Sequence, residues 1–177
     1  MPIIIGLIGA VTVAFIWIMR MRNAAEMTHE LAGVAQDVMS AARRLGFRKK
    51  YNTHPVESVD EPHLAISAIA IAFLELDGLP TAEQQDALLR SLQSHTGQGL
   101  KDAEESLILG RWLVNESNGP APAVSRLARR LAKIDRAGGF NPLMGVLNDI
   151  ATAGRGGVVS DRQKDALAEI ARAFKLN

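Results

Sequence analysis

Residues 3–19 carry no formal charge and are almost entirely apolar, and this stretch constrains the fold more than any other. A helix of this length extends about 25 Å, slightly less than a hydrocarbon core of about 30 Å. Arg20 and Arg22 follow and can extend their charges to the headgroups, and Trp17 lies where an interfacial indole is favoured. The stretch therefore predicts a transmembrane anchor over residues 1–22.

Two other interpretations of this stretch fit less well. A cleavable signal peptide has a basic segment before its apolar core, whereas only Met1 and Pro2 precede residue 3. A helix buried in a soluble core usually keeps a polar face, and residues 3–18 show none. Because the arginines follow the stretch, the positive-inside rule predicts a single-pass protein of a bacterial-type inner membrane, with its N-terminus outside and its C-terminal domain in the cytoplasm.

Small residues recur every four positions within the predicted anchor. Gly6, Ala10 and Ala14 would lie in one groove of a helix and permit the close approach of a second helix. Glycine and alanine are also common in membrane spans that make no such contact. This face, with Trp17, is a candidate site for packing against an integral membrane complex or a second copy of the chain.

Residues 23–50 predict a juxtamembrane helix with a basic end. Apolar side chains recur at steps of four and three residues, which suits either a short coiled coil or an amphipathic helix that rests on its own domain. The pattern is short and favours the amphipathic helix, which Gly46 would end. The apolar positions are Met27, Leu31, Val34, Val38, Ala41 and Leu45.

Basic residues cluster at the end of this helix, with Phe47 and Tyr51 interleaved. After a membrane anchor, such a cluster is attracted to anionic lipid headgroups, although a merely solvated helix end is an equally open alternative. Nucleic acid is not expected, because no binding motif accompanies the cluster and the net charge is only +1. The residues expected at the lipid surface are Arg20, Arg22, Arg43, Arg44, Arg48, Lys49 and Lys50.

The remaining chain predicts a linker over residues 51–62 and one helical domain over residues 63–177. Alanine and leucine dominate and aromatic residues make up only 5% of the chain, which favours helices over a sheet. The expected fold is all-α, with the anchor followed by a bundle of about six or seven helices.

Three details of that bundle follow from local patterns. Residues 64–76 are the most apolar segment of the domain and predict its central helix. Residues 100–116 predict a long helix whose buried side chains are Ala103, Leu107, Ile108, Trp112 and Leu113. Asn141 predicts the cap of a later helix whose first residue is Pro142.

Two stretches of the domain, residues 77–88 and 156–167, repeat one pattern. Each contains a glycine, two apolar residues, a Thr or Ser cap, a glutamine three residues later and then Asp-Ala-Leu. The caps are Thr81 with Gln84 and Ser160 with Gln163, which match the capping box of a helix N-terminus. The repeat predicts two helical hairpins that pack around one core.

With these paired turns, residues 63–177 resemble the TerB-like helical domains of tellurite-resistance proteins, including the domain beside the membrane anchor of DjlA-type co-chaperones. The resemblance implies acidic residues at both turns and a divalent metal site. This chain departs from that pattern, because Gly156 replaces one acidic residue and glutamines stand where glutamates are usual. Asp77 is the one matching candidate metal ligand, and a turn residue that bonds its own backbone is the alternative interpretation.

No motif for catalysis appears in the chain. It has no cysteine, which excludes thiolate chemistry, and its four histidines share no i, i+4 spacing. P-loop, dinucleotide-binding and nucleophile-elbow motifs are all missing from the sequence. We therefore expect neither an enzyme nor a cofactor.

The expected function is a membrane-anchored interaction or scaffold module that docks a protein partner, or a larger membrane complex, at the cytoplasmic face. The family resemblance implies a loose link to stress. The alternative is a metal- or metalloid-responsive sensor of the tellurite-resistance type with a degenerate acidic site.

Overall fold

The structure is a computed structural model that describes residues 35–153 and 158–175, and these residues form helices and loops with no strand among them. The predicted all-α class is confirmed for this part of the chain. Residues 35–44 are helical. The elements that follow are the 3₁₀ turn η1 (Pro55–Ser58) and the helices α2 (Pro62–Glu75), α3 (Ala82–Thr96), α4 (Leu100–Glu116), α5 (Pro120–Ile134), α6 (Arg136–Thr152) and α7 (Asp161–Phe174).

By its internal contacts the chain divides into two units, Met1–Met39 and Ser40–Asn177. The second unit contains every helix from α2 to α7, and it begins earlier than the domain boundary that the sequence predicts at residue 63. Among the helices that the structure describes, none combines the length and apolar character that crossing a bilayer requires.

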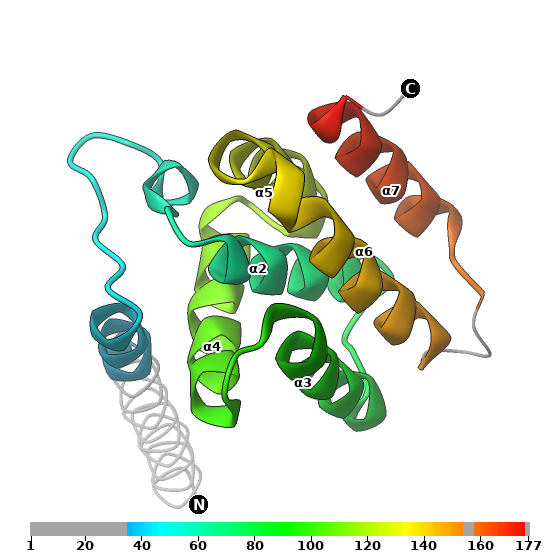
Figure 1. The fold of residues 1–177 in the computed structure, drawn as a ribbon, viewed down its shortest axis with the longest axis horizontal. Coiled ribbons are helices and arrows are strands. Elements are labelled where there is room, and N and C mark those ends of the chain that lie inside the picture. The colour runs from blue at the N-terminus through cyan, green and yellow to red at the C-terminus, as the bar shows by residue number, and fades with distance from the viewer. Residues whose placement is uncertain (1–34, 154–157, 176–177) are drawn as a thin grey trace, which may run out of the picture. The chain divides into compact units, whose positions relative to one another are not determined.

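Helix α2 lies at the centre of the second unit, as predicted for residues 64–76 (Figure 1). Every residue from Leu64 to Leu74 is buried, because α3, α4, α5 and α6 all pack against this helix. Isoleucine and alanine alternate along much of it, so bulky side chains fill the core while small ones permit close helix contacts. Helix α4 approaches α2 closely at Gly110, where an added Cβ would lie 3.2 Å from the backbone of Ala68.

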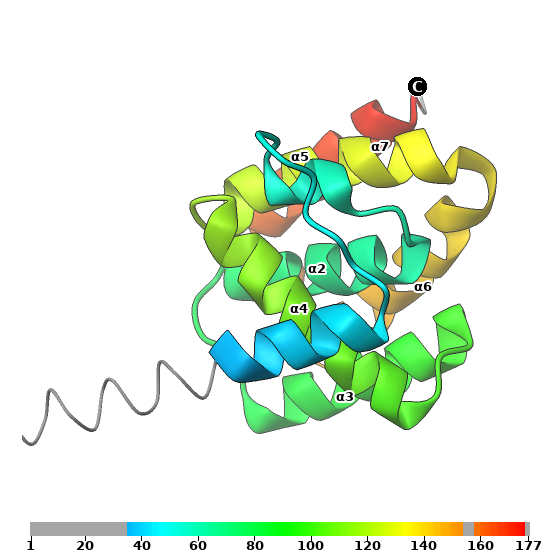
Figure 2. The same ribbon diagram turned by 90° about the vertical axis from the view of Figure 1, so that its left-hand side faces the viewer.

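The outer helices pair with one another around α2. Helix α3 packs on α6, and α5 packs on α7 (Figures 1 and 2). Amphipathic α7 buries Ile170 and Phe174, and the ring of Phe174 lies 5.3 Å from that of Phe140 at the start of α6. These pairings complete a bundle in which each outer helix buries one face.

The segment that the sequence predicts as a linker is packed onto the bundle over part of its length. Val56 and Val59 are fully buried, and η1 contacts α4 and α5. The buried Arg130 of α5 fixes the end of this segment, because its Nε donates to the carbonyl of Val59 at 2.6 Å and its guanidinium pairs with Asp60. A buried cation with two oxygen partners makes this a defined contact and not a loose connection.

One helix start differs from the sequence prediction. Helix α6 begins at Arg136, and its cap is Asp135, whose carboxylate accepts a hydrogen bond from the backbone N–H of Gly138 at 2.8 Å. Pro142 consequently lies inside the helix and Asn141 caps nothing. Both Asp and Asn are good caps by residue type, so sequence alone does not decide between them.

Candidate functional site

The two predicted turns form the same structure twice. In the first, the Thr81 hydroxyl accepts from the backbone N–H of Gln84 at 3.2 Å, and the Gln84 side chain accepts from the N–H of Thr81 at 3.0 Å. In the second, Ser160 and Gln163 make the equivalent pair of bonds, both at 3.1 Å. Both capping boxes are therefore confirmed, one at the start of α3 and the other at the start of α7.

Direct hydrogen bonds join these two turns. The Ser160 hydroxyl donates to Asp77 Oδ1 at 2.9 Å, and Arg162 donates to the backbone carbonyl of Leu76 at 3.0 Å. The side-chain amide of Gln163 reaches the carbonyl of Phe73 at 3.5 Å. The start of α7 is thus fixed to the end of α2, although the two segments are more than 80 residues apart in sequence.

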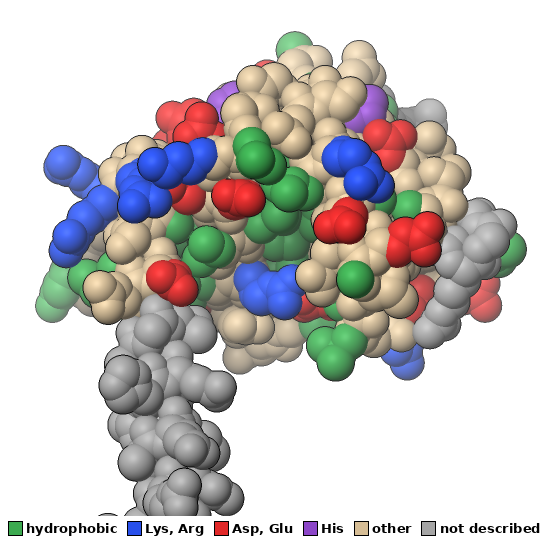
Figure 3. Space-filling view, turned by 90° about the horizontal axis from the view of Figure 1, so that it is seen from below, with side chains coloured by type: hydrophobic (Ala, Val, Ile, Leu, Met, Phe, Trp, Pro, Cys, Tyr) green, Lys and Arg blue, Asp and Glu red, His purple; other side chains and the backbone are tan. Residues whose placement is uncertain are grey.

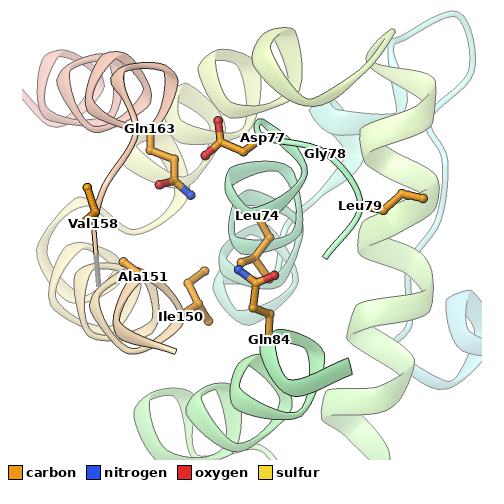
Figure 4. A pocket seen from close by; sticks show the side chains of 9 residues that line it. All are labelled: Leu74, Asp77, Gly78, Leu79, Gln84, Ile150, Ala151, Val158 and Gln163. Atoms are coloured by element: carbon orange, nitrogen blue, oxygen red, sulfur yellow. The ribbon is translucent and has the colours of Figure 1, made fainter. Parts of the chain in front are cut away.

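A small cavity lies where the turns meet, and we call it the paired-turn site (Figure 4). Asp77 and Gln163 lie on one side of it and Gln84 on the other. Its volume of about 40 Å³ leaves room for little more than a water molecule or an ion. Its lining residues are Leu74, Asp77, Gly78, Leu79, Gln84, Ile150, Ala151, Val158 and Gln163.

Each polar side chain at the paired-turn site already makes at least one hydrogen bond within the protein. Asp77 accepts the Ser160 hydrogen bond, and the carbonyl oxygens of Gln84 and Gln163 serve in the capping boxes. Divalent metal ions such as calcium favour several converging carboxylate oxygens. In the described part of the chain, no group of three or more His, Cys, Asp or Glu side chains is placed to hold a metal ion.

Two apolar side chains at this site face solvent. Leu79 is 93% exposed and Val158 is 77% exposed, and they occupy matching positions two residues before the two caps. In Figure 4 the side chain of Leu79 points away from the cavity. Burial of either side chain against another surface would be favourable.

The basic cluster divides into two groups in the structure. Arg44 pairs with Glu105 of α4 at 2.5 Å, and Lys50 pairs with Asp60 at 3.4 Å. Arg43, Arg48 and Lys49 are exposed and have no ion-pair partner among the residues described. Figure 3 shows Lys and Arg side chains gathered at the left of one face, beside Asp and Glu side chains.

The other residues predicted at membrane sites belong to the N-terminal part of the sequence. The candidate helix-packing face and the first two arginines lie outside the described residues, which begin at 35. These residues are Gly6, Ala10, Ala14, Trp17, Arg20 and Arg22.

A polar cluster between α3 and α6 was not predicted from the sequence. Both the Ser91 hydroxyl and Nε2 of His95 lie within hydrogen-bond distance of Asp149 Oδ2, at 2.7 and 2.9 Å. The hydrogen bond from Ser91 contributes most to lowering the pKa of Asp149, and His95 lowers it further, against the opposing effect of burial. The i, i+4 spacing of Ser91 and His95 was the available signal, because it places both on one face of a helix.

These residue types occur in hydrolases, but their arrangement here differs. In a Ser-His-Asp triad the histidine bonds to the serine hydroxyl and removes its proton. Here Ser91 donates to the carboxylate of Asp149, the same oxygen that His95 contacts. The cluster therefore joins α3 to α6 through one carboxylate oxygen.

A comparison of the chain with protein-family models, with curated proteins and with solved structures finds no match.

Proposed function

We propose that this chain is a membrane-anchored, non-catalytic interaction module whose TerB-like helical domain docks a protein partner at the cytoplasmic face. The observation that carries the proposal is the exposed basic group of Arg43, Arg48 and Lys49 with Tyr51, which is 91% exposed, on the segment that enters the bundle. In the sequence this segment follows the apolar stretch of residues 3–19. Cations and an exposed aromatic ring beside an anchor suit an anionic lipid surface.

The partner would bind at the paired-turn site. Leu79 and Val158 give it two exposed apolar contacts at matching positions of the repeat, and the hydrogen bonds between the turns support both. Pre-organised apolar contacts of this kind lose little entropy when a partner binds. The partner is a single protein, a larger membrane complex or a second copy of the chain.

Membrane attachment is tested by comparing the full chain with a version that lacks the residues before Asn23. The full chain should stay in the membrane fraction after an alkaline wash, and the shortened version should float with anionic vesicles at low salt only. Replacing Arg43, Arg48 and Lys49 by glutamine should abolish this flotation. The matched control replaces three exposed cations on α3 and α5, Arg90, Arg129 and Lys133, and should float as before. An equal loss of flotation in both triple variants would contradict a specific lipid-facing group.

Partner docking is tested by mild-detergent pull-down of the full chain. Substituting Leu79 and Val158 by serine should remove the specific partners, whereas serine at the exposed Leu100 of α4 should not. If partners are lost only when the apolar stretch of residues 3–19 is removed, that stretch itself is the interface. Partners retained by the Leu79 and Val158 variant would contradict docking at the paired turns.

The alternative function, a metal- or metalloid-responsive sensor, is favoured by one observation. The paired-turn site is an ion-sized cavity beside the carboxylate of Asp77. Calorimetric titration with calcium, manganese and zinc tests it. Tight stoichiometric binding that disappears in Asp77→Ala would replace the docking proposal.

A further inference from the structure

A groove runs beside the entry of the chain into the bundle. Two segments line it, residues 45–50 and residues 58–64, and its volume is about 400 Å³. It adjoins a second hollow of about 300 Å³ near the loop between α3 and α4, and both are lined by Leu45, Glu61 and Leu64. Volumes in this range suit a small ligand. We call this feature the charged groove.

The two segments that line the charged groove are held together by the protein itself. The backbone N–H of Lys50 donates to the hydroxyl of Ser58 at 2.8 Å, and the Lys50 ammonium pairs with Asp60. Arg130 pairs with Asp60 as well and holds the carbonyl of Val59. The groove is therefore formed before a ligand arrives, which reduces the entropy lost on binding.

Residues of both charge signs line this groove. Arg48 and Lys49 line it and have no ion-pair partner among the residues described. Asp60 is engaged by two cations, whereas Glu61 has a single ion-pair contact in the described part of the chain, to the His63 ring at 3.9 Å. A ligand that carries an anionic and a cationic group matches this mixed lining.

Apolar side chains form the rest of the lining. Leu45 and the buried Leu64 lie in the groove, together with Phe47, whose ring packs edge-on against Trp112 of α4 at 5.9 Å. Leu45 and Phe47 are half-buried and can contact the hydrocarbon part of an amphiphile next to its headgroup. These two side chains add an apolar contact to the charged residues.

We propose that the charged groove binds the phosphate and primary ammonium of an aminophospholipid headgroup, of the phosphatidylethanolamine type. The guanidinium of Arg48 and the ammonium of Lys49 bind the phosphate, for which a guanidinium is geometrically suited. Glu61 binds the ammonium, which has three N–H donors. A choline headgroup lacks those donors, and a glycerol headgroup lacks the positive charge that Glu61 requires.

This proposal rests on the proposed membrane attachment and adds a lipid specificity to it. General attraction to anionic lipid needs only cations, and Glu61 opposes it by repulsion. Aminophospholipid binding needs Glu61. Glu61 precedes α2 without making a side-chain cap hydrogen bond, so its replacement by glutamine leaves the helix intact.

The test is calorimetry of the full chain in a neutral maltoside detergent with soluble dihexanoyl lipids. The ethanolamine lipid should bind at least about tenfold more tightly than the choline and glycerol lipids, since a charge-assisted hydrogen bond contributes on this scale. Glu61→Gln should weaken binding of the ethanolamine lipid by about tenfold without weakening the glycerol lipid. Arg48→Gln should weaken all three, and Glu57→Gln, an exposed carboxylate on η1, is the matched control and should change nothing.

Several results would overturn the proposal. Equal binding of the three lipids, or an unchanged affinity in Glu61→Gln, would remove the assigned roles. Free phosphoethanolamine that binds as tightly as the lipid would overturn the assignment to a membrane lipid. Because the dihexanoyl lipids need no bilayer, this experiment can succeed or fail independently of the membrane-fraction test.

Discussion

The ring of His95 lies against the backbone of α6 because position 145 is a glycine. A Cβ at Gly145 would lie 2.4 Å from Nδ1 of His95, well inside contact distance. The same ring must stay in place to reach Asp149. At this position, the absence of a side chain is what permits a polar contact between α3 and α6.

Gly145→Ala should therefore destabilise the protein by about 1–3 kcal/mol through overpacking, even though alanine is the better helix former. In a His95→Ala background the same change should stabilise by about 1 kcal/mol, because only the helix preference is left. Urea denaturation of the four proteins measures both effects. A change of the same sign in both backgrounds would show that the ring is not the obstacle.

The carboxylate of Asp149 should make stability depend on pH in the acid range. Its pKa is lowered in the folded state below the ordinary 3.8, chiefly by the hydrogen bond from Ser91. Its contribution to stability is therefore present above the ordinary value and is lost as the pH falls through the lowered pKa. Ser91→Ala should move the pKa of Asp149 up toward 3.8 and reduce the stability that is lost on acidification.

Carbon-detected NMR titration of the carboxyl groups measures the shift directly. Asp161 is the internal reference, because the hydrogen bond from Lys164 lowers its pKa and Ser91 makes no contact with it. A Ser91→Ala variant in which Asp149 titrates as before would assign the lowered pKa to His95 alone.

At the scale of the element, local sequence patterns predict helix bounds and caps correctly where a single pattern points to them. Residues 100–116 were predicted as a helix and form α4 over the same range, and both capping boxes form as expected. The prediction for Ile108 was wrong, since it is exposed while Leu109 and Gly110 beside it are buried against the bundle. Which residues at the edge of an apolar face are covered depends on the neighbouring helix, and the periodicity of one helix does not contain that information.

The two capping boxes should differ in their energetic importance. Thr81→Ala removes one cap hydrogen bond and should cost about 1 kcal/mol. Ser160→Ala removes the equivalent bond and also the one donated to Asp77, which adds about 1 kcal/mol. In an Asp77→Ala background the cost of Ser160→Ala should fall to that of Thr81→Ala, because coupled contacts are not additive. Thermal unfolding of the set checks this, and equal costs in the wild-type background would contradict a structural link between the turns.

At the scale of the whole molecule, the contacts that define the candidate sites join distant parts of the chain. Ser160 meets Asp77, Arg130 meets Val59 and Arg44 meets Glu105, over separations of 83, 71 and 61 residues. The sequence predicts the repeat, the basic cluster and the helices, since each is a local pattern. It does not predict that the turns touch, or that Glu105 is buried beside a cation, because those facts depend on helix packing.

The residues of the basic cluster should consequently differ in what they contribute to stability, although each carries the same charge. The Glu105 side chain is only 6% exposed, so Arg44→Gln leaves a buried carboxylate without its cation. The free energy of unfolding should fall by about 2 kcal/mol. This is less than for a fully buried pair, because Arg44 is half exposed and its charge is screened by solvent. Arg43 is the neighbouring residue and its side chain is exposed, so Arg43→Gln should change the free energy of unfolding by less than about 0.5 kcal/mol.

Both variants remove one positive charge from the same surface, so both should weaken low-salt binding to anionic vesicles to a similar degree. Urea denaturation of the two proteins, each lacking the residues before Asn23, measures the difference in stability, and vesicle flotation measures the shared loss of binding. If Arg43→Gln lost as much stability as Arg44→Gln, the pairing with Glu105 would not be what fixes this segment to α4. If neither variant changed flotation, the lipid-facing role would belong to Arg48 and Lys49 alone, and the charged groove would be the principal membrane contact of the bundle.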